Sequence, residues 1–354
     1  MERTSPGRPF KTEARWKRQE WPIGRQPKTV GSPKGEPYVR RVFRRALTII
    51  PLVLLACIAG AFTVRNGPDA ETRAAVVSLA DPGRVLPRPA RVAVLALENR
   101  SYEQVIGSPR APFLNRLARR YALATRYYAL AHPSLPNYIA LTGGDTYGIH
   151  TNCSTCVTPH HNLLNQLNRA EIGWRAYFEG LADGAALRAR TARYNPHYNP
   201  FAYFERIAGS PSARRRIGNF TDLRRDVAAR RLARFSWIAP DVFHDGHNSS
   251  LSQADRFAAR LVPQVLRALG SRGVLYLVWD EGPNSDLRGA GGSPGGGRVV
   301  LIAAGGAARR GARSSVPVNH YALLRTIEAN LGLPALRRAG LPSTPLLSGL
   351  LRPR

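Results

Sequence analysis

The 354-residue sequence is poor in cysteine, with three in the whole chain. One of them, Cys57, lies in an apolar segment near the N-terminus, so Cys153 and Cys156 form the only pair in the body. A single Cys-x-x-Cys pair does not complete a four-cysteine zinc site. In an oxidising compartment we expect it to form a short-loop disulfide, with a redox pair as the alternative.

Acidic residues and lysine are also scarce. Asp and Glu number 23 against 52 Lys and Arg, which gives a formal net charge of +29, and all four lysines lie in the first 45 residues. The remaining basic charge is arginine and reflects base composition, so not every arginine is a contact. A basic body favours a phosphorylated substrate, an anionic membrane surface or nucleic acid as partner. No nucleic-acid partner is expected, because aromatic residues do not interleave with the basic runs.

The N-terminal region predicts a disordered, basic cytoplasmic tail over 1–45 and a transmembrane segment over 46–64, which carries no charge. Arginines flank it on the N-terminal side: Arg40, Arg41, Arg44 and Arg45. This asymmetry places the N-terminus in the cytoplasm and the body outside. A single-pass anchor, a signal peptide cut after 59–61 and a lipoprotein signal ending at Cys57 remain open, and all three predict export.

After a polar linker over 65–90, the region 91–350 reads as one catalytic domain. Short apolar runs predict strands over 91–97, 174–178, 235–239, 273–279 and 298–303. Helical spacing predicts helices over 112–128, 163–167, 212–234, 254–269 and 319–331, and a further helix from about 137. Alternating strands and helices indicate an α/β fold with a mainly parallel sheet.

Polar residues follow three of these predicted strands. Glu98 and Asn99 come after the first, Asp280 and Glu281 come after 273–279, and strand 235–239 runs into a loop with two Asp and two His over 240–247. Each is by itself a common strand or helix cap. In a parallel sheet, however, these exits meet at one edge, where ligands bind. The pattern therefore predicts a cation-binding edge.

A serine held between two prolines is the main candidate for chemistry. It lies in the stretch His-Pro-Ser-Leu-Pro-Asn over 132–137, which leads into a predicted helix. Proline restricts its own backbone and that of the preceding residue, so Ser134 is expected on a stiff turn. A hydroxyl at a helix N-terminus is suited to bind phosphate or to become an alkoxide. The alternative is an ordinary N-cap serine.

Five motifs together resemble the bacterial phosphoesterase family, which includes acid phosphatases and phospholipases C of the alkaline phosphatase superfamily. They are Glu98 to Tyr102, His132 to Gly144, Asp245 to His247, Trp279 to Gly282 and Asn319 to Glu328. The resemblance covers about 91–335 and keeps the family's order. It implies a three-layer α/β/α sandwich with an alkaline phosphatase-like sheet.

The resemblance also implies residue roles. A divalent metal, as one ion or two, would bind Glu98, Asn99, Ser134, Asp280 and Glu281. Ser134 would be the nucleophile and form a phosphoserine intermediate, with His132 near the leaving group and His247 as a further catalytic residue. Asn137, Asp245 and His320 would bind the substrate phosphate. Two departures are Tyr198 directly before Asn-Pro-Phe, where the family often has histidine, and His244 in place of an asparagine.

These roles predict a metal-dependent phosphomonoesterase acting on a phosphorylated small molecule. A phospholipase C-type phosphodiesterase acting on phospholipid head groups is the first alternative, which membrane attachment through 46–64 would favour. A non-catalytic surface binding module is the second alternative.

Overall fold

The computed structural model describes residues 86–353. The predicted tail 1–45, the apolar segment 46–64 and most of the linker lie outside the described residues. Among the helices from residue 86 onward, none combines the length and the apolar character needed to cross a bilayer.

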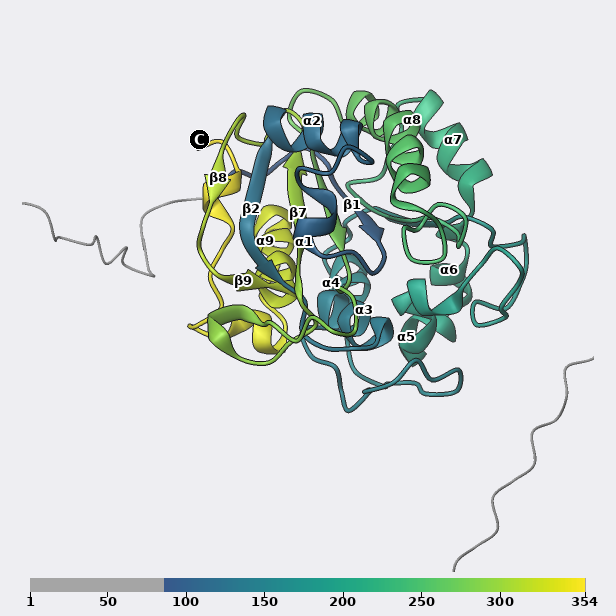
Figure 1. Ribbon diagram of the computed structural model, residues 1–354. Helices are drawn as coiled ribbons and strands as arrows, with labels where there is room; N and C mark the ends of the chain where they lie inside the picture. The colour runs from purple at the N-terminus through teal and green to yellow at the C-terminus, as the bar shows by residue number, and fades with distance from the viewer. Residues whose placement is uncertain (1–85, 354) are drawn as a thin grey trace, which may run out of the picture. The chain divides into compact units, whose positions relative to one another are not determined.

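Nine strands of the described chain form one sheet (Figure 1). They are β1 (Val92–Leu97), β2 (Ala122–Tyr128), β3 (Trp174–Phe178), β4 (Ile217–Gly218), β5 (Phe235–Ala239), β6 (Val274–Trp279), β7 (Arg298–Ala304), β8 (Arg313–Ser314) and β9 (Val318–Asn319). The spatial order is β4-β3-β5-β1-β6-β7-β2-β8, and β9 pairs with β2. The order places β1 and β6, which carry the predicted metal ligands at their ends, side by side.

The sheet is mostly parallel, as predicted. Strands β4, β3, β5, β1 and β6 run parallel to one another, whereas β7 is antiparallel to both β6 and β2. Every residue of β1, β5 and β6 is buried. Strands that are covered on both faces have continuous apolar sequences, and for this reason these strands could be predicted from the sequence.

Helices cover the sheet on both faces (Figure 1). They are α1 (Tyr102–Val105), α2 (Pro112–Arg120), α3 (Ser134–Gly143), α4 (Leu163–Arg169), α5 (Glu205–Ala208), α6 (Pro211–Arg214), α7 (Phe220–Ala228), α8 (Leu251–Leu269) and α9 (His320–Leu331). Helices α2 and α7 pack on α8, while α3 packs on α9, and both α8 and α9 contact β1. Two short 3-10 turns, η1 (Pro196–Tyr198) and η2 (Pro200–Tyr203), follow β3.

Capping residues set the ends of the two long helices. Ser250 and Gln253 form a reciprocal capping box at the start of α8. Asn319 accepts a hydrogen bond from the Tyr321 N–H at the start of α9, and Gly332 ends that helix in the left-handed conformation. Such caps satisfy N–H and C=O groups that have no partner within the helix. Helix α9 confirms the predicted last helix, and α8 contains the whole of the helix predicted over 254–269 and begins three residues earlier.

Two predicted helices are wrong in part. The helix predicted over 112–128 ends at Arg120, and the second half is strand β2, where Thr and Tyr favour pairing with β7. The helix predicted over 212–234 is divided into α6, β4 and α7, because Asn219 caps a new helix after Gly218. In both cases tertiary pairing with a neighbouring strand outweighs local helical spacing.

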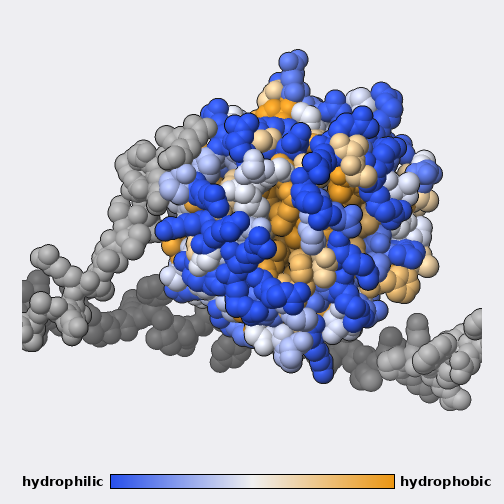
Figure 2. Space-filling view, turned by 90° about the horizontal axis from the view of Figure 1, so that it is seen from above, coloured by the Kyte–Doolittle hydropathy of each residue, from blue (hydrophilic) through white to orange (hydrophobic). Residues whose placement is uncertain are grey.

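A groove of about 530 Å³ lies between α2 and α8. Seen from above, apolar side chains gather there in a hollow surrounded by hydrophilic ones (Figure 2). Its lining includes Leu117 and Leu266 together with Arg116 and Arg120, and it contains none of the predicted site residues.

Candidate active site

The ends of β1 and β6 bring four predicted site residues together. Leu97 and Trp279 are paired at the last position of the two strands, so Glu98 and Asn99 emerge next to Asp280 and Glu281. The Asn99 N–H donates to Asp280 Oδ1 at 3.0 Å, and the Asn99 side-chain amide donates to Glu281 Oε1 at 2.7 Å. Glu98, Asp280 and Glu281 are each at most 2% exposed.

Ser134 joins this group from the opposite side. It is the first residue of α3, which begins three residues earlier than predicted. Its hydroxyl lies 2.9 Å from Glu281 Oε1, 3.1 Å from Glu98 Oε2 and 3.5 Å from Asn99 Oδ1. The structure therefore places the serine oxygen among the oxygens of the acidic cluster, as a shared metal site requires.

The cluster brings three buried carboxyl groups close together. Burial, together with the nearby charge of Asp280, raises the pKa of Glu98 well above its ordinary value. Burial and the charge of Glu281 raise the pKa of Asp280 in the same way. Asp280 Oδ2 is buried and has no hydrogen-bond partner among residues 86–353. Carboxylate, amide and hydroxyl oxygens are the ligands of hard divalent cations, so these residues fit such an ion.

His132 lies at the edge of the cluster. Its Nδ1 is 2.5 Å from Glu281 Oε2, and its Nε2 is 3.0 Å from the Asp286 carbonyl oxygen. Both neighbours are acceptors, so the doubly protonated ring satisfies both contacts. The hydrogen bond to Glu281 raises the pKa of His132 above its ordinary value, against the opposing effect of burial.

His320 and Asn137 lie behind the site. His320 is fully buried between the Tyr127 hydroxyl at 2.7 Å and the Asp280 carbonyl oxygen at 2.6 Å, and burial lowers its pKa to about 4. Asn137 accepts from the N–H groups of Leu130 and Ala131 and donates to the carbonyls of Ala131 and Pro133. These contacts connect both side chains to neighbouring protein groups, and their predicted contacts with the substrate remain predictions.

Asp245 organises the loop that follows β5. Its carboxylate accepts from the Tyr198 hydroxyl at 2.8 Å, from the His247 N–H at 2.9 Å and from the Asn248 N–H at 3.0 Å. Tyr198, which directly precedes Asn-Pro-Phe, therefore supports this loop. His247 is brought to the wall of a cavity.

A cavity of about 420 Å³ opens on the site. Glu98 and Ser134 line one part of it, together with His247 and Asn248. Its remaining wall comes from the segment before and within η1, with Arg190, Asn195 and His197. The serine hydroxyl is therefore next to a space large enough for a small phosphoester.

Two supporting residues were missed from the sequence. The Tyr138 hydroxyl donates a short hydrogen bond to Glu98 Oε1. Tyr138 is four residues after Ser134 on the same helix, and this spacing, which puts both side chains on one face, was the available signal. Asn152 accepts the Leu135 N–H at 2.9 Å, so this N–H at the helix start is not free to bind phosphate.

The disulfide between Cys153 and Cys156 is formed, as expected for an oxidising compartment. It begins directly after Asn152. The link restricts the loop that carries this asparagine to the start of α3.

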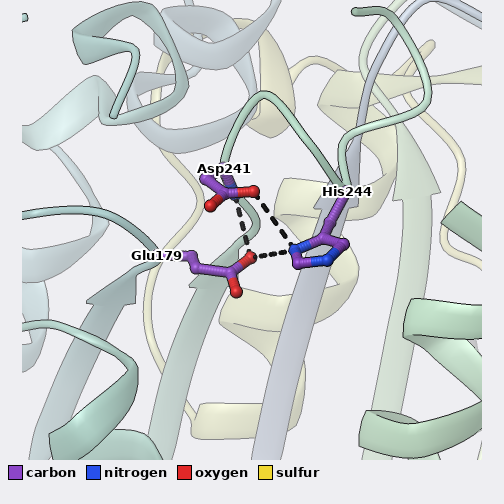
Figure 3. Close-up of side chains that lie close together, drawn as sticks. All are labelled: Glu179, Asp241 and His244. Atoms are coloured by element: carbon purple, nitrogen blue, oxygen red, sulfur yellow. Dashed lines mark hydrogen bonds and ion pairs between the residues drawn. The ribbon is translucent and has the colours of Figure 1, made fainter. Parts of the chain in front are cut away.

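A second cluster of potential metal ligands lies at the ends of β3 and β5 (Figure 3). Ligand atoms of Glu179, Asp241 and His244 all lie within 4.8 Å of one another. His244 Nδ1 is 2.8 Å from Glu179 Oε2 and 3.1 Å from Asp241 Oδ1. Arg193 Nε donates to Asp241 Oδ2 at 2.6 Å, so a guanidinium already neutralises this group. Glu179 was not predicted as a site residue, because the residues that follow β3 match none of the motifs in the sequence.

The fold is similar to that of a solved protein of the alkaline phosphatase superfamily. A superfamily member from Vibrio parahaemolyticus aligns with a TM-score of 0.53 over 73% of this chain and 71% of its own, at 12% sequence identity. The model of the Phosphoesterase family matches residues 108–334. The chain belongs to this family, a family of phosphoester hydrolases.

Named relatives agree with this assignment. A protein of Kluyveromyces lactis named probable acid phosphatase is 25% identical over 259 residues, which is 70% of this chain and 59% of the relative. A Mycobacterium tuberculosis protein named phosphatidylinositol-3-phosphatase is 27% identical over 251 residues, which is 70% of this chain and 79% of the relative. The chain spans 59% of the Kluyveromyces relative and 55% of a phosphate-repressible acid phosphatase from Penicillium chrysogenum.

Proposed function

We propose that the chain is a metal-dependent phosphomonoesterase with Ser134 as nucleophile. The observation that carries the proposal is the position of the Ser134 hydroxyl, between Glu98 and Glu281 and at the wall of the cavity. The names of the acid phosphatase relatives support a monoester substrate.

Glu98, Asn99, Asp280, Glu281 and the Ser134 oxygen would hold a divalent cation. When bound, the ion favours the serine alkoxide and offsets charge on the phosphoryl oxygens. The unpartnered Asp280 Oδ2 and the raised pKa of Glu98 and of Asp280 support this assignment.

The chain's own residues supply the remaining steps. Ser134 Oγ forms a bond to phosphorus while the ester P–O bond breaks, and the hydroxyl proton passes to a carboxylate that already accepts its hydrogen bond. The leaving alcohol takes a proton from His132, which carries one on each ring nitrogen. Water then attacks the phosphoserine and passes a proton to His132, and the bond from phosphorus to Ser134 Oγ breaks as the carboxylate returns the proton to Ser134 and inorganic phosphate leaves.

The test compares the wild type with Ser134→Ala on p-nitrophenyl phosphate. We expect kcat to fall by about 10³ or more because the covalent route is lost. Ser252→Ala, on the surface of α8, is the matched control and should keep full activity. Unchanged turnover in Ser134→Ala would exclude the serine mechanism.

The same purified protein also tests which class of ester is hydrolysed and whether the activity depends on a metal. Release of phosphate from monoesters is compared with release of diacylglycerol from phosphatidylcholine, and a phospholipase C-type enzyme would favour the second. If a chelator abolishes turnover and one divalent ion per chain restores it, the result supports metal dependence. If the purified protein binds no metal and hydrolyses no ester, the result would favour a non-catalytic binding module.

We also propose that the domain works outside the cytoplasm, anchored through 46–64 or released after cleavage. The disulfide between Cys153 and Cys156 supports an oxidising location. Protease treatment of intact cells should digest the domain without lysis, and protection until lysis would argue against export.

A further inference from the structure

The cavity beside Ser134 is lined by side chains of opposite charge, Glu98 and Arg190. Apart from Glu98 and Ser134, its lining includes Arg190, Asn195 and His197, which are called the second wall. If Ser134 attacks phosphorus, as proposed above, the alcohol part of the substrate occupies the remainder of this space. The second wall therefore contacts the leaving group.

Arg190 is the cationic side chain on that second wall. It donates to Asn195 Oδ1 at 2.8 Å, and within residues 86–353 it forms no ion pair with a carboxylate. Arg193, three residues further on, differs in this respect because it pairs with Asp241 and Glu179. Arg190 thus brings an uncompensated positive charge to the cavity.

The neighbours of Arg190 hold it in place without neutralising it. Asn195 is 8% exposed and also accepts from the His197 N–H at 3.2 Å, so its amide oxygen is fixed. Burial, and to a smaller extent the charge of Arg190, lowers the pKa of His197 to about 4. His197 is therefore a neutral hydrogen-bonding group at neutral pH, and the wall keeps the single charge of the guanidinium.

We infer that Arg190 binds a second anionic group on the alcohol part of the substrate. The preferred substrates are phosphomonoesters whose leaving alcohol carries a further phosphate, phosphodiester or carboxylate. A planar guanidinium fits each of these groups with two hydrogen bonds. Substrates with a neutral alcohol gain nothing from this wall.

The kinetic test uses alkanediol bisphosphates of three to six carbons and the monophosphates of the same diols. We expect the wild type to favour a bisphosphate in kcat/KM by about tenfold, mainly through KM, beyond the factor of two for its two cleavable ends. Arg190→Gln should abolish the preference by lowering kcat/KM for the bisphosphates, and Arg190→Lys should keep part of it. Arg260→Gln, exposed on α8, is the control for overall charge.

Unchanged preference in Arg190→Gln would overturn the inference. A second arm compares glycerophosphoinositol 3-phosphate in solution with the same head group in vesicles. A loss of turnover in Arg190→Gln with both the soluble and the vesicle-bound substrate supports a second-anion site. A loss with vesicles alone would show that Arg190 attracts the protein to an anionic surface, and it would overturn the inference.

A binding measurement separates this inference from the proposed function. Calorimetry with butane-1,4-diol bisphosphate on Ser134→Ala should show weaker binding, by about tenfold, when Arg190→Gln is added. Equal affinity in the two proteins would overturn the inference, whatever the outcome of the activity assays. Absence of hydrolysis by the wild type would overturn only the proposed function.

Discussion

The Ser134 hydroxyl lies 2.9 Å from Oε1 of Glu281, a residue 147 positions further along the chain. The other oxygen of Glu281 contacts His132 Nδ1. One carboxylate thus connects the proposed nucleophile with the proposed proton donor.

Asp280→Asn should separate metal binding from folding. In the metal-free protein the substitution removes a buried charge that repels Glu281, so we expect a gain of about 2 kcal/mol and a rise in Tm of a few degrees. The wild type should gain stability with added Mn²⁺ or Mg²⁺, by about 2.7 kcal/mol at a hundredfold excess over Kd. Differential scanning calorimetry with chelator and with metal measures both effects.

The control for Asp280→Asn is Asp183→Asn, which removes a charge from an exposed loop. This variant should respond to metal as the wild type does. A metal-dependent rise in Tm that is equal in Asp280→Asn and in the wild type would contradict the proposed ligand set.

Asn137→Ala should loosen the turn before Ser134. The variant leaves the buried N–H groups of Leu130 and Ala131 without their acceptor, so we expect a loss of about 3 kcal/mol in the free energy of unfolding. Urea unfolding measures the loss, and Asn165→Ala at the more accessible start of α4 should cost about 1 kcal/mol.

Activity tells whether Asn137 positions the serine or binds substrate. A positioning role predicts a lower kcat in Asn137→Ala with an unchanged KM at temperatures where the variant is folded. A rise in KM with unchanged kcat would instead support the substrate contact predicted from the sequence.

Much of the fold could be predicted because its central strands are buried on both faces. The apolar runs of β1, β5 and β6 have no competing interpretation. Strand β2 was missed because its pairing with β7 is a long-range contact, and the helical spacing before it continued the wrong pattern. Its antiparallel neighbour β7 could not be oriented from composition alone.

The proximity of Glu98, Asn99, Asp280 and Glu281 could be expected because exits of parallel strands share an edge. The contacts of Asn137 and His320 depend on how side chains pack in three dimensions. The order of motifs along the sequence does not predict such contacts. Arg190 lay outside every motif. It contacts Asn195, directly before η1, and the loop after β5 lines the same cavity, which no spacing rule predicts.

Glu328→Gln should stabilise the protein at alkaline pH. Burial raises the pKa of Glu328 to about 8, so in the folded state its carboxyl holds a proton that the unfolded chain releases near pH 4.5. The stability of the wild type should therefore fall as pH rises from about 4.5 to about 8, by several kcal/mol. The Gln variant lacks this loss, so its Tm should exceed that of the wild type at pH 8 and match it near pH 4.

The geometry around Glu328 supports this pH dependence. Its Oε1 accepts the Leu336 N–H at 3.0 Å, which a glutamine oxygen can also do, and its Oε2 has no partner among the described residues. Glu205→Gln on an exposed position is the control and should leave the profile unchanged. A Tm difference independent of pH would show that the effect comes from packing.

His132→Asn tests proton donation to the leaving group. The asparagine amide can still donate to Glu281 as Nδ1 does, but it carries no proton that it can release. With p-nitrophenyl phosphate, whose leaving group needs no proton, we expect kcat to fall by less than about tenfold. With glycerol 2-phosphate, whose alkoxide is a poor leaving group, the fall should reach about 10² to 10³. Plotting log kcat against the leaving-group pKa for aryl and alkyl phosphates should give a steeper slope in the variant. A parallel drop across the series would assign His132 a positioning role only, because a misplaced Glu281 slows every ester alike.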